Sequence, residues 1–126
     1  MYRQVTNYRR DEGFDACNHL LTLPMPPTAI FVAAGDVCAT GVLLALKKNG
    51  IEVPRQMSVI GFDDQPFTEL VEPALSTVRQ PMVKMGAAAL NLLKDGATAG
   101  ESRKTAKIVF PTELIVRHST GPAPRG

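Results

Sequence analysis

The chain has 126 residues, of which 44% are hydrophobic, and it carries a formal net charge of +2. This length suits one domain with a single core, and the apolar fraction excludes a disordered chain. The charge is too small to indicate nucleic acid or a membrane surface as a partner, and no apolar run approaches the length needed to span a bilayer.

Strand-like and helix-like patterns alternate along the chain. In order, they predict a strand at 2–6, a helix at 9–22, a strand at 28–36, a helix at 37–49, a strand at 57–62, a short helix or turn at 66–71, a strand at 75–80, a helix at 81–94, a polar loop at 95–105 and two strand-like runs split by Pro111 within 106–117. Such alternation requires crossover connections, which predict an α/β fold with a parallel, doubly wound sheet and helices on both faces.

Two of these strands carry apolar runs that do not alternate, TAIFVAAGD at 28–36 and MSVIGF at 57–62. A continuous apolar run is typical of a strand that is covered on both faces. The first of the two ends at Gly35 and Asp36, and one of these residues is the expected N-cap of the helix at 37–49.

Three residue pairs, each with at least one polar or charged member, lie at the carboxyl ends of the predicted strands. They are Gly35-Asp36, Asp63-Asp64 and Arg79-Gln80. In an open α/β sheet, ligands bind outside the carboxyl ends of the strands, where such side chains converge. Either Asp63 or Asp64 can therefore face a ligand while the other caps the next turn. That both acids merely cap turns remains the alternative.

Two cysteines, Cys17 and Cys38, lie among apolar residues in helix-like patterns. Buried thiols in a reducing compartment are therefore expected instead of a disulfide.

Residues 1–10, MYRQVTNYRR, lack the apolar centre of a signal peptide. We expect a cytoplasmic protein.

Four separate blocks occur in the order typical of one known family. They are the turn AAGD at 33–36, VPRQMSVIGFDD at 53–64, PALSTVRQPMVKMG at 73–86 and the closing PTELIVRHST at 111–120. Through these blocks, and over about Val5–Thr120, the chain resembles the effector-binding core of the LacI/GalR family of bacterial transcription regulators. The resemblance implies a periplasmic-binding-protein-like fold of two α/β subdomains around a ligand cleft.

The resemblance also implies how the chain is divided. Residues 1–80 correspond mainly to the C-terminal subdomain, and residues 81–110 to a helix and crossover that normally pack on the N-terminal subdomain. Residues 1–120 are thus expected to form a partial, incomplete effector-binding and dimerisation core, with 121–126 as a disordered tail. Operator DNA would be bound only through a helix-turn-helix, which these residues do not contain.

Several positions that contact ligand in the family fall on residues of this chain. The resemblance makes Asp63 the acceptor of hydrogen bonds from hydroxyl groups of a sugar or related metabolite, and Tyr8 an aromatic ring on the ligand's apolar face. Gln80 and Met82 are further candidates, although packing roles for Tyr8 and Met82 stay open. The family's Ala-Asn-Asp turn has Gly35 in place of its asparagine. This departure indicates an effector other than a standard monosaccharide, or one with a larger or differently placed polar group.

A homodimer is the other implication of the resemblance. The matching surface comprises Val37, Thr40, Leu44, Phe67 and Val71. For Leu44 a place in the core is an equally simple explanation, because one face of its helix must be buried. Thr40 and Val71 are therefore the more informative pair.

An enzyme or phosphoacceptor is the alternative from a different class. Paired acids at strand ends can hold Mg²⁺, and Asp36, Asp63 and Asp64 with Lys84 could form such a group. However, the paired acids follow a middle strand, and the sequence has no Gly-rich phosphate loop and no histidine near a candidate nucleophile. We therefore expect no enzymatic activity, no cofactor and no metal.

Overall fold

The computed structural model describes residues 2, 4–98 and 107–123, with the backbone alone at 95–98. Its helices and strands are, in chain order, α1 (Arg10–Leu21), β1 (Ala29–Phe31), α2 (Asp36–Lys48), β2 (Ser58–Asp63), the 3₁₀ helix η1 (Pro66–Glu69), β3 (Ser76–Arg79), α3 (Met82–Thr98) and β4 (Glu113–Ile115). The chain divides into two units, a first unit of residues 1–79 with 114–126 and a second unit of residues 80–113.

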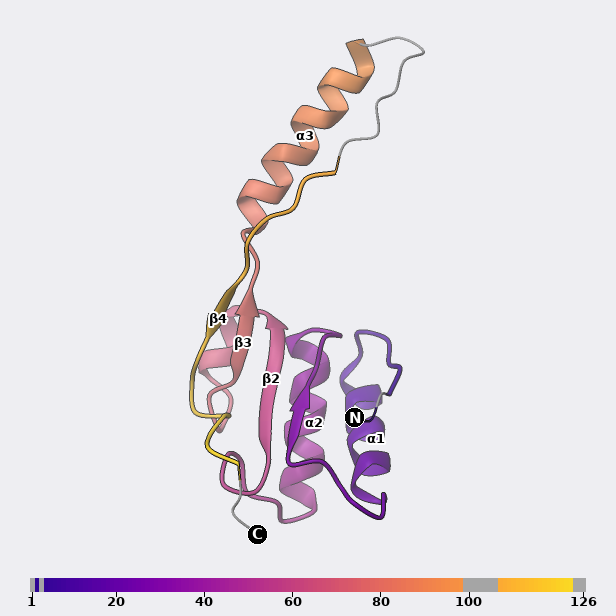
Figure 1. The fold of residues 1–126 in the computed structure, drawn as a ribbon, viewed down its shortest axis with the longest axis vertical. Helices are drawn as coiled ribbons and strands as arrows, with labels where there is room; N and C mark the ends of the chain where they lie inside the picture. Colours follow the sequence, from indigo (N-terminus) through magenta and orange to yellow (C-terminus); the bar gives the residue numbers. More distant parts are fainter. Residues whose placement is uncertain (1, 3, 99–106, 124–126) are drawn as a thin grey trace. The chain divides into compact units, whose positions relative to one another are not determined.

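The four strands form one sheet in the order β1-β2-β3-β4 (Figure 1). β2 runs parallel to β1 and to β3, with Ile30 opposite Val59 and Gly61 opposite Thr77. The parallel pair β1 and β2 is joined through α2, which is the crossover that parallel neighbours require. The predicted α/β fold class with a parallel sheet is therefore confirmed.

The core of the first unit lies between β2, α2 and α1, and the two helices pack side by side (Figure 1). Its buried side chains include Cys17 of α1, Val42 of α2 and Val59 of β2. The backbones of the two helices approach closely at Gly41, where an added Cβ would lie 1.9 Å from the carbonyl oxygen of Arg10. The helix predicted at 9–22 is thus present, and its buried residues include Gly13, Cys17 and Leu20.

Both cysteines are buried free thiols, as the sequence predicts. Burial raises the pKa of Cys17 to about 11. The hydroxyl oxygen of Thr6 lies 3.6 Å from the sulfur of Cys38. No helix in the part of the chain that the structure describes is both long and apolar enough to cross a membrane.

The second unit contains α3, which begins directly after Pro81, as predicted. The helix continues past the predicted end at Lys94 to Thr98. Its exposed large apolar side chains are Met82, Val83, Leu90, Leu92 and Leu93. The rest of the polar loop predicted at 95–105 lies outside the described residues, as do residues 124–126 of the predicted disordered tail.

Three sequence predictions about strands are wrong. Residue 2 and residues 4–6 form no strand, because no strand among the described residues lies beside them to share their backbone hydrogen bonds. β1 is not covered on both faces, since Ala29 and Phe31, which share one face, are both exposed and Phe31 is 57% exposed. Of residues 107–117, which were expected to hold two strand-like runs, only Glu113–Ile115 pairs into the sheet.

β1 is one of the two outer strands of the sheet, and a groove of about 1070 Å³ lies beside it. The groove is bounded by the N-terminal segment, α1 and β1, and its wall includes Tyr2, Val5, Tyr8, Met25 and Phe31. These five side chains are all exposed. The outer edge of the sheet is therefore an apolar surface with little cover.

Candidate functional site

The carboxyl ends of β1 and β2 lead into turns with unusual backbone conformations. Gly35, the N-cap of α2, has a φ of 93°, while Asp63 and Asp64 have φ values of 105° and 56°. Positive φ is uncommon for residues other than glycine and concentrates at functional sites, where surrounding contacts must stabilise it. The conformation of Asp63 and Asp64 therefore needs a structural explanation.

Tyr8, Gly35 and Asp63 meet at this end of the sheet. A Cβ atom added to Gly35 would lie 2.9 Å from Asp63 Oδ2 and 3.9 Å from Tyr8 Cδ1. Tyr8 is 76% exposed and Asp63 is half-buried. An accessible aromatic ring beside a carboxylate can pack on the apolar face of a ring-shaped ligand and accept hydrogen bonds from its hydroxyl groups. Three of the five predicted ligand residues are thus brought together.

Asp36, the first residue of α2, is buried beneath this turn, with 1% of its surface exposed. Its carboxylate accepts a hydrogen bond from the Gln65 N–H at 2.8 Å and one from the Thr77 hydroxyl at 2.7 Å. Burial raises the pKa of Asp36 against the opposing effect of these two bonds, and the charge of Asp63 raises it further. The carboxylate lies against the backbone of Gly61, where an added Cβ would be 2.2 Å from Asp36 Oδ1. Asp36 therefore joins α2 to β3 and to the turn after β2, and does not cap its own helix.

Asp64 is held by two arginines. Its carboxylate accepts hydrogen bonds from Arg79 Nε at 2.6 Å and from Arg117 Nη2 at 2.8 Å. Desolvation acts to raise the pKa of Asp64, but the hydrogen bonds from the arginines outweigh it and lower the pKa below its ordinary value. Arg117 also donates to Glu69 of η1 and to the Leu75 carbonyl, both at 3.0 Å. These contacts explain the position and the positive φ of Asp64 without a ligand.

The acids of the magnesium alternative do not form a metal site. In residues 2, 4–98 and 107–123, no group of three or more His, Cys, Asp or Glu side chains is arranged to hold a metal ion. Asp36 is engaged by Thr77 and the Gln65 N–H, and Asp64 by its two arginines. The structure therefore gives this alternative no support.

Gln80 and Met82, the other two predicted ligand residues, belong to the second unit. The N–H of Met82 donates to the Gln80 carbonyl at 2.9 Å, and the Met82 side chain is 60% exposed. Lys84 follows on the same helix, α3. The assignment of Gln80 and Met82 to the ligand site stays a prediction.

The predicted dimer residues lie on α2 and around η1. Val37 is 47% exposed, and the Thr40 hydroxyl donates to its carbonyl at 2.7 Å. Phe67 and Val71 are half-buried, and Val71 also packs against the core. Leu44 is half-buried at the surface of α2.

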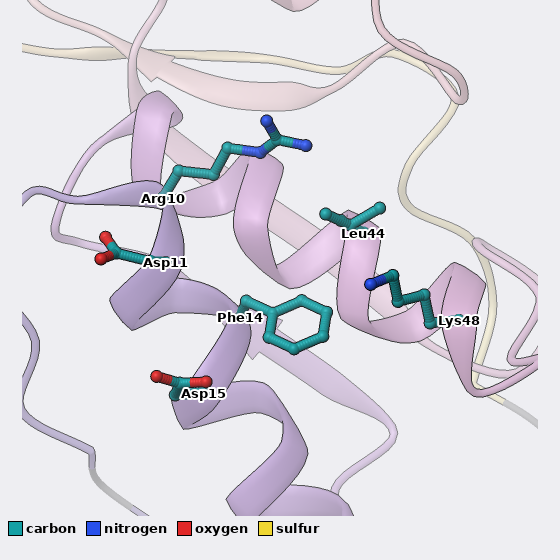
Figure 2. A pocket seen from close by; sticks show the side chains of 6 residues that line it. All are labelled: Arg10, Asp11, Phe14, Asp15, Leu44 and Lys48. Atoms are coloured by element: carbon teal, nitrogen blue, oxygen red, sulfur yellow. The ribbon is translucent and has the colours of Figure 1, made fainter.

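Leu44 lines a shallow pocket of about 300 Å³ between α1 and α2 (Figure 2). The other residues that line it are Arg10, Asp11, Phe14, Asp15 and Lys48. The ammonium group of Lys48 lies 5.1 Å from the centre of the Phe14 ring, at the distance of a cation–π contact. The outer side of the helix pair therefore combines an apolar floor with charges of both signs.

The structure is thus a parallel α/β core in which three candidate ligand residues lie together at the strand ends, the edge at which open α/β sheets bind ligands. The periplasmic binding protein-like domain family matches residues 2–120. The chain belongs to this family, in the form found in LacI-family transcription regulators.

Two curated relatives show the extent of the match. The HTH-type transcriptional repressor CytR of Escherichia coli (strain K12) is 39% identical over 114 residues, which cover 90% of this chain and 33% of the repressor. The HTH-type transcriptional repressor PurR of Haemophilus influenzae is 34% identical over 114 residues, covering 89% of this chain and 34% of that protein. The chain thus spans about a third of the length of these relatives.

Solved structures give the same result. A LacI-family transcriptional regulator from Mycobacterium smegmatis matches with a TM-score of 0.81 and 31% identity, covering 92% of this chain and 43% of that one. A LacI-family regulator from Enterococcus faecium, solved with bound ribose, matches with a TM-score of 0.74 and 26% identity, covering 96% and 43%.

Sequence reasoning missed two residues that shape the site, Thr77 and Arg117. Arg117 follows the apolar run LIV at 114–116, just as Asp63 follows SVIGF, so the same strand-end signal could have found it. Thr77 lies inside a strand pattern and gave no signal, because its partner Asp36 is far away in the sequence.

Proposed function

We propose that this chain is the effector-binding and dimerisation part of a cytoplasmic LacI-family transcription regulator, and that its effector is a sugar or related metabolite. The observation that carries the proposal is the convergence of Tyr8, Gly35 and Asp63 at the strand ends. The ribose bound to the Enterococcus faecium regulator supports a sugar-like effector. In the whole regulator, operator DNA would be bound by a helix-turn-helix outside these residues.

Each of the three residues has a distinct role in this proposal. Asp63 accepts hydrogen bonds from ligand hydroxyl groups, and Tyr8 packs on the apolar face of the ligand ring. Gly35 contributes its backbone and leaves room for Asp63, whose Oδ2 lies only 2.9 Å from the position that a Cβ at residue 35 would take. The side-chain contact that the family places on an asparagine is absent here, because Gly35 can offer only its backbone.

Dimerisation is proposed through α2 and η1. The exposed Val37 and the half-buried Thr40, Leu44, Phe67 and Val71 form one surface in this proposal. The pocket beside Leu44 extends it with apolar area and with both signs of charge, a composition that suits contact with a second copy. Replacing Thr40 by arginine in the full-length regulator should weaken the dimer, which sedimentation would show.

The test of the ligand role uses the full-length regulator and calorimetric titration, starting with ribose and continuing with other sugars and nucleosides. Asp63→Asn should reduce effector affinity by more than about 1 kcal/mol, the scale of a lost hydrogen bond to a charged group. Glu52→Gln, the same kind of change at an exposed acid between α2 and β2, is the matched control and should leave affinity unchanged. Equal affinity of wild type and Asp63→Asn would rule out the proposed role.

A further inference from the structure

Arg117 connects three separate parts of the first unit through one guanidinium group. Nη2 donates to Asp64 at 2.8 Å and to Glu69 of η1 at 3.0 Å, while Nη1 donates to the Leu75 carbonyl at 3.0 Å. Its own backbone N–H donates to Ser76 Oγ at 2.9 Å. The side chain therefore sits where the end of β2, the 3₁₀ helix and the start of β3 come together.

Arg79 also donates to the Asp64 carboxylate, but its side chain is much more exposed than that of Arg117. The Arg79 side chain is 49% exposed, whereas those of Arg117 and Asp64 are 11% and 9% exposed. Water and salt screen an exposed ion pair, so its contribution is small, while a buried pair is screened much less. Removing one partner of a buried pair also leaves the other charge without compensation. The Arg117 contact should therefore matter more than the Arg79 contact.

The group that Arg117 holds is part of a strained turn. Asp64 has a φ of 56° and directly follows Asp63, whose φ is 105°. Positive φ at two successive residues other than glycine persists only when the surroundings determine it. The Asp64 carboxylate is fixed by the arginines, and its N–H lies 3.3 Å from Thr77 Oγ1. Since one peptide unit joins the two residues, fixing Asp64 also orients the backbone of Asp63.

η1 is the second element that Arg117 reaches. Glu69 lies within the segment 67–71, which carries the predicted dimer residues Phe67 and Val71. The same segment is tied to the turn after β2 by Thr68, whose hydroxyl and N–H donate to the Gln65 carbonyl at 2.7 and 2.9 Å. The turn and η1 therefore share both the Arg117 contact and a backbone connection.

We propose that Arg117 is a positioning residue that holds the Asp63–Asp64 turn in its left-handed conformation and fastens it to η1. Arg117 does not touch the ligand; it sets the direction of the Asp63 carboxylate through Asp64. The consequence for the ligand rests on the function proposed above, whereas the consequence for the turn does not. A movement of the Asp63 carboxylate on ligand binding would be transmitted through the Arg117 guanidinium to residues 67–71.

Amide hydrogen exchange measured by NMR on the 126-residue chain tests the role without a ligand. In Arg117→Lys, the amides of Gln65 and Thr68 should exchange at least about tenfold faster. The single ammonium nitrogen of lysine cannot replace the two nitrogen groups by which arginine reaches Asp64 and Glu69 through Nη2 and the Leu75 carbonyl through Nη1. Arg79→Lys is the matched control and should change these rates less than about threefold. Asp64→Asn, which removes the same ion pair from the other side, should reproduce the Arg117→Lys pattern.

The amides of Val42 and Leu46 in α2 separate positioning from general destabilisation. Their exchange should stay within about threefold of wild type in Arg117→Lys, since local opening of the turn leaves the core closed. A uniform increase in α2 and the turn, or no increase at Gln65, would overturn the proposal.

Ribose titration of the full-length regulator supplies the second readout. Arg117→Lys should weaken ribose binding by about fivefold, and Arg79→Lys should not. Unchanged ribose affinity in Arg117→Lys, with loss in Asp63→Asn, would overturn the positioning role and leave the proposed function intact. Failure of ribose and other sugars to bind the wild type would reject the proposed function, while the exchange rates would still decide the role of Arg117 in the turn.

Discussion

β1 and β2 have similar apolar sequences but very different surroundings. β2 lies inside the sheet, where Val59 is fully buried against α2, whereas β1 is an outer strand and Phe31 is 57% exposed. The difference shows that an apolar run predicts a strand but does not say how much of it will be covered. Cover depends on which elements pack beside the strand, and this is a property of the whole fold.

The same contrast separates the carboxyl end of β2 from the open edge at β1. At the end of β2, buried polar groups bond one another, and among the described side chains no buried nitrogen or oxygen atom lacks a hydrogen-bond partner. Such a network specifies one geometry, because each partly satisfied alternative leaves an unpaired polar group in a low dielectric. Along β1 the surface is apolar and non-directional. The ordered end suits ligand recognition, and the open edge suits association.

The largest effect is expected from removing the acid beneath the strand-end turn. Asp36→Ala leaves the Thr77 hydroxyl and the Gln65 N–H without their acceptor and should lower the free energy of unfolding by about 3 kcal/mol. Asp63→Ala, at the adjacent but more accessible turn, should lower it by less than about 1 kcal/mol. Urea unfolding measures both values. Equal losses would mean that the network is no more important than the surface beside it.

Core truncation compares the two strands directly. Val59→Ala on β2 should lower the free energy of unfolding by roughly 2 kcal/mol, because it removes two buried methyl groups and leaves a cavity. Phe31→Ala on β1 should lower it by less than about 1 kcal/mol although it deletes a larger side chain, since most of that side chain is already in water. Thermal or urea melts of both variants decide the matter. A larger loss for Phe31→Ala would show that β1 is covered in solution.

Self-association tests the open edge itself. An outer strand with exposed apolar neighbours recruits other chains, so the 126-residue chain should associate at micromolar concentration. Phe31→Lys should weaken this association several-fold, because a charge on an edge strand opposes further pairing. Val116→Lys, at an exposed valine outside the groove, is the matched control. Sedimentation velocity gives the measurement, and a monomeric wild type would contradict the expectation.

The smallest effects are expected from pH. The pKa of Asp64 is lowered by its arginines, so its contribution to stability is present above its ordinary pKa of 3.8 and is lost as the pH falls through the folded value. The pKa of Asp36 is raised chiefly by burial, so its contribution is present below 3.8 and is lost as the pH rises through the folded value. The urea midpoint, measured between about pH 3 and 6, should therefore depend less on pH in both variants. The loss of pH dependence should lie at the acid end of this range in Asp64→Asn and at the upper end in Asp36→Asn. Identical profiles for both variants would contradict the opposite signs.

Much of the fold was predictable from local patterns. Periodicity and turn residues located α1, α2, β2, η1, β3 and the start of α3, because each of these depends on residues close together in the chain. The predicted strand at 2–6 failed because a strand needs a partner that its own sequence does not specify. The exposed face of β1 could not be foreseen for the same reason.

The candidate site was predictable only in part. Strand-end position pointed to the pairs Gly35-Asp36 and Asp63-Asp64. The family resemblance singled out Gly35, Asp63 and Tyr8, and the structure brings these three together. The burial of Asp36 could not be read from the sequence, since its partner Thr77 is a distant residue that is joined to it only by the sheet. The resemblance already assigned the ligand contact to Asp63, and the structure adds the two arginine contacts of Asp64, of which the contact from Arg117 was not predicted.

The central claim is that Asp63, and neither Asp36 nor Asp64, meets the ligand. The most direct test is carbon-13 NMR of the aspartate carboxyl groups in the full-length regulator during titration with ribose or with the sugar that screening identifies. The Asp63 signal should shift to saturation with the dissociation constant of the complex, and the Asp36 signal should stay within the line width. A saturating shift at Asp36 or Asp64 with none at Asp63 would contradict the claim.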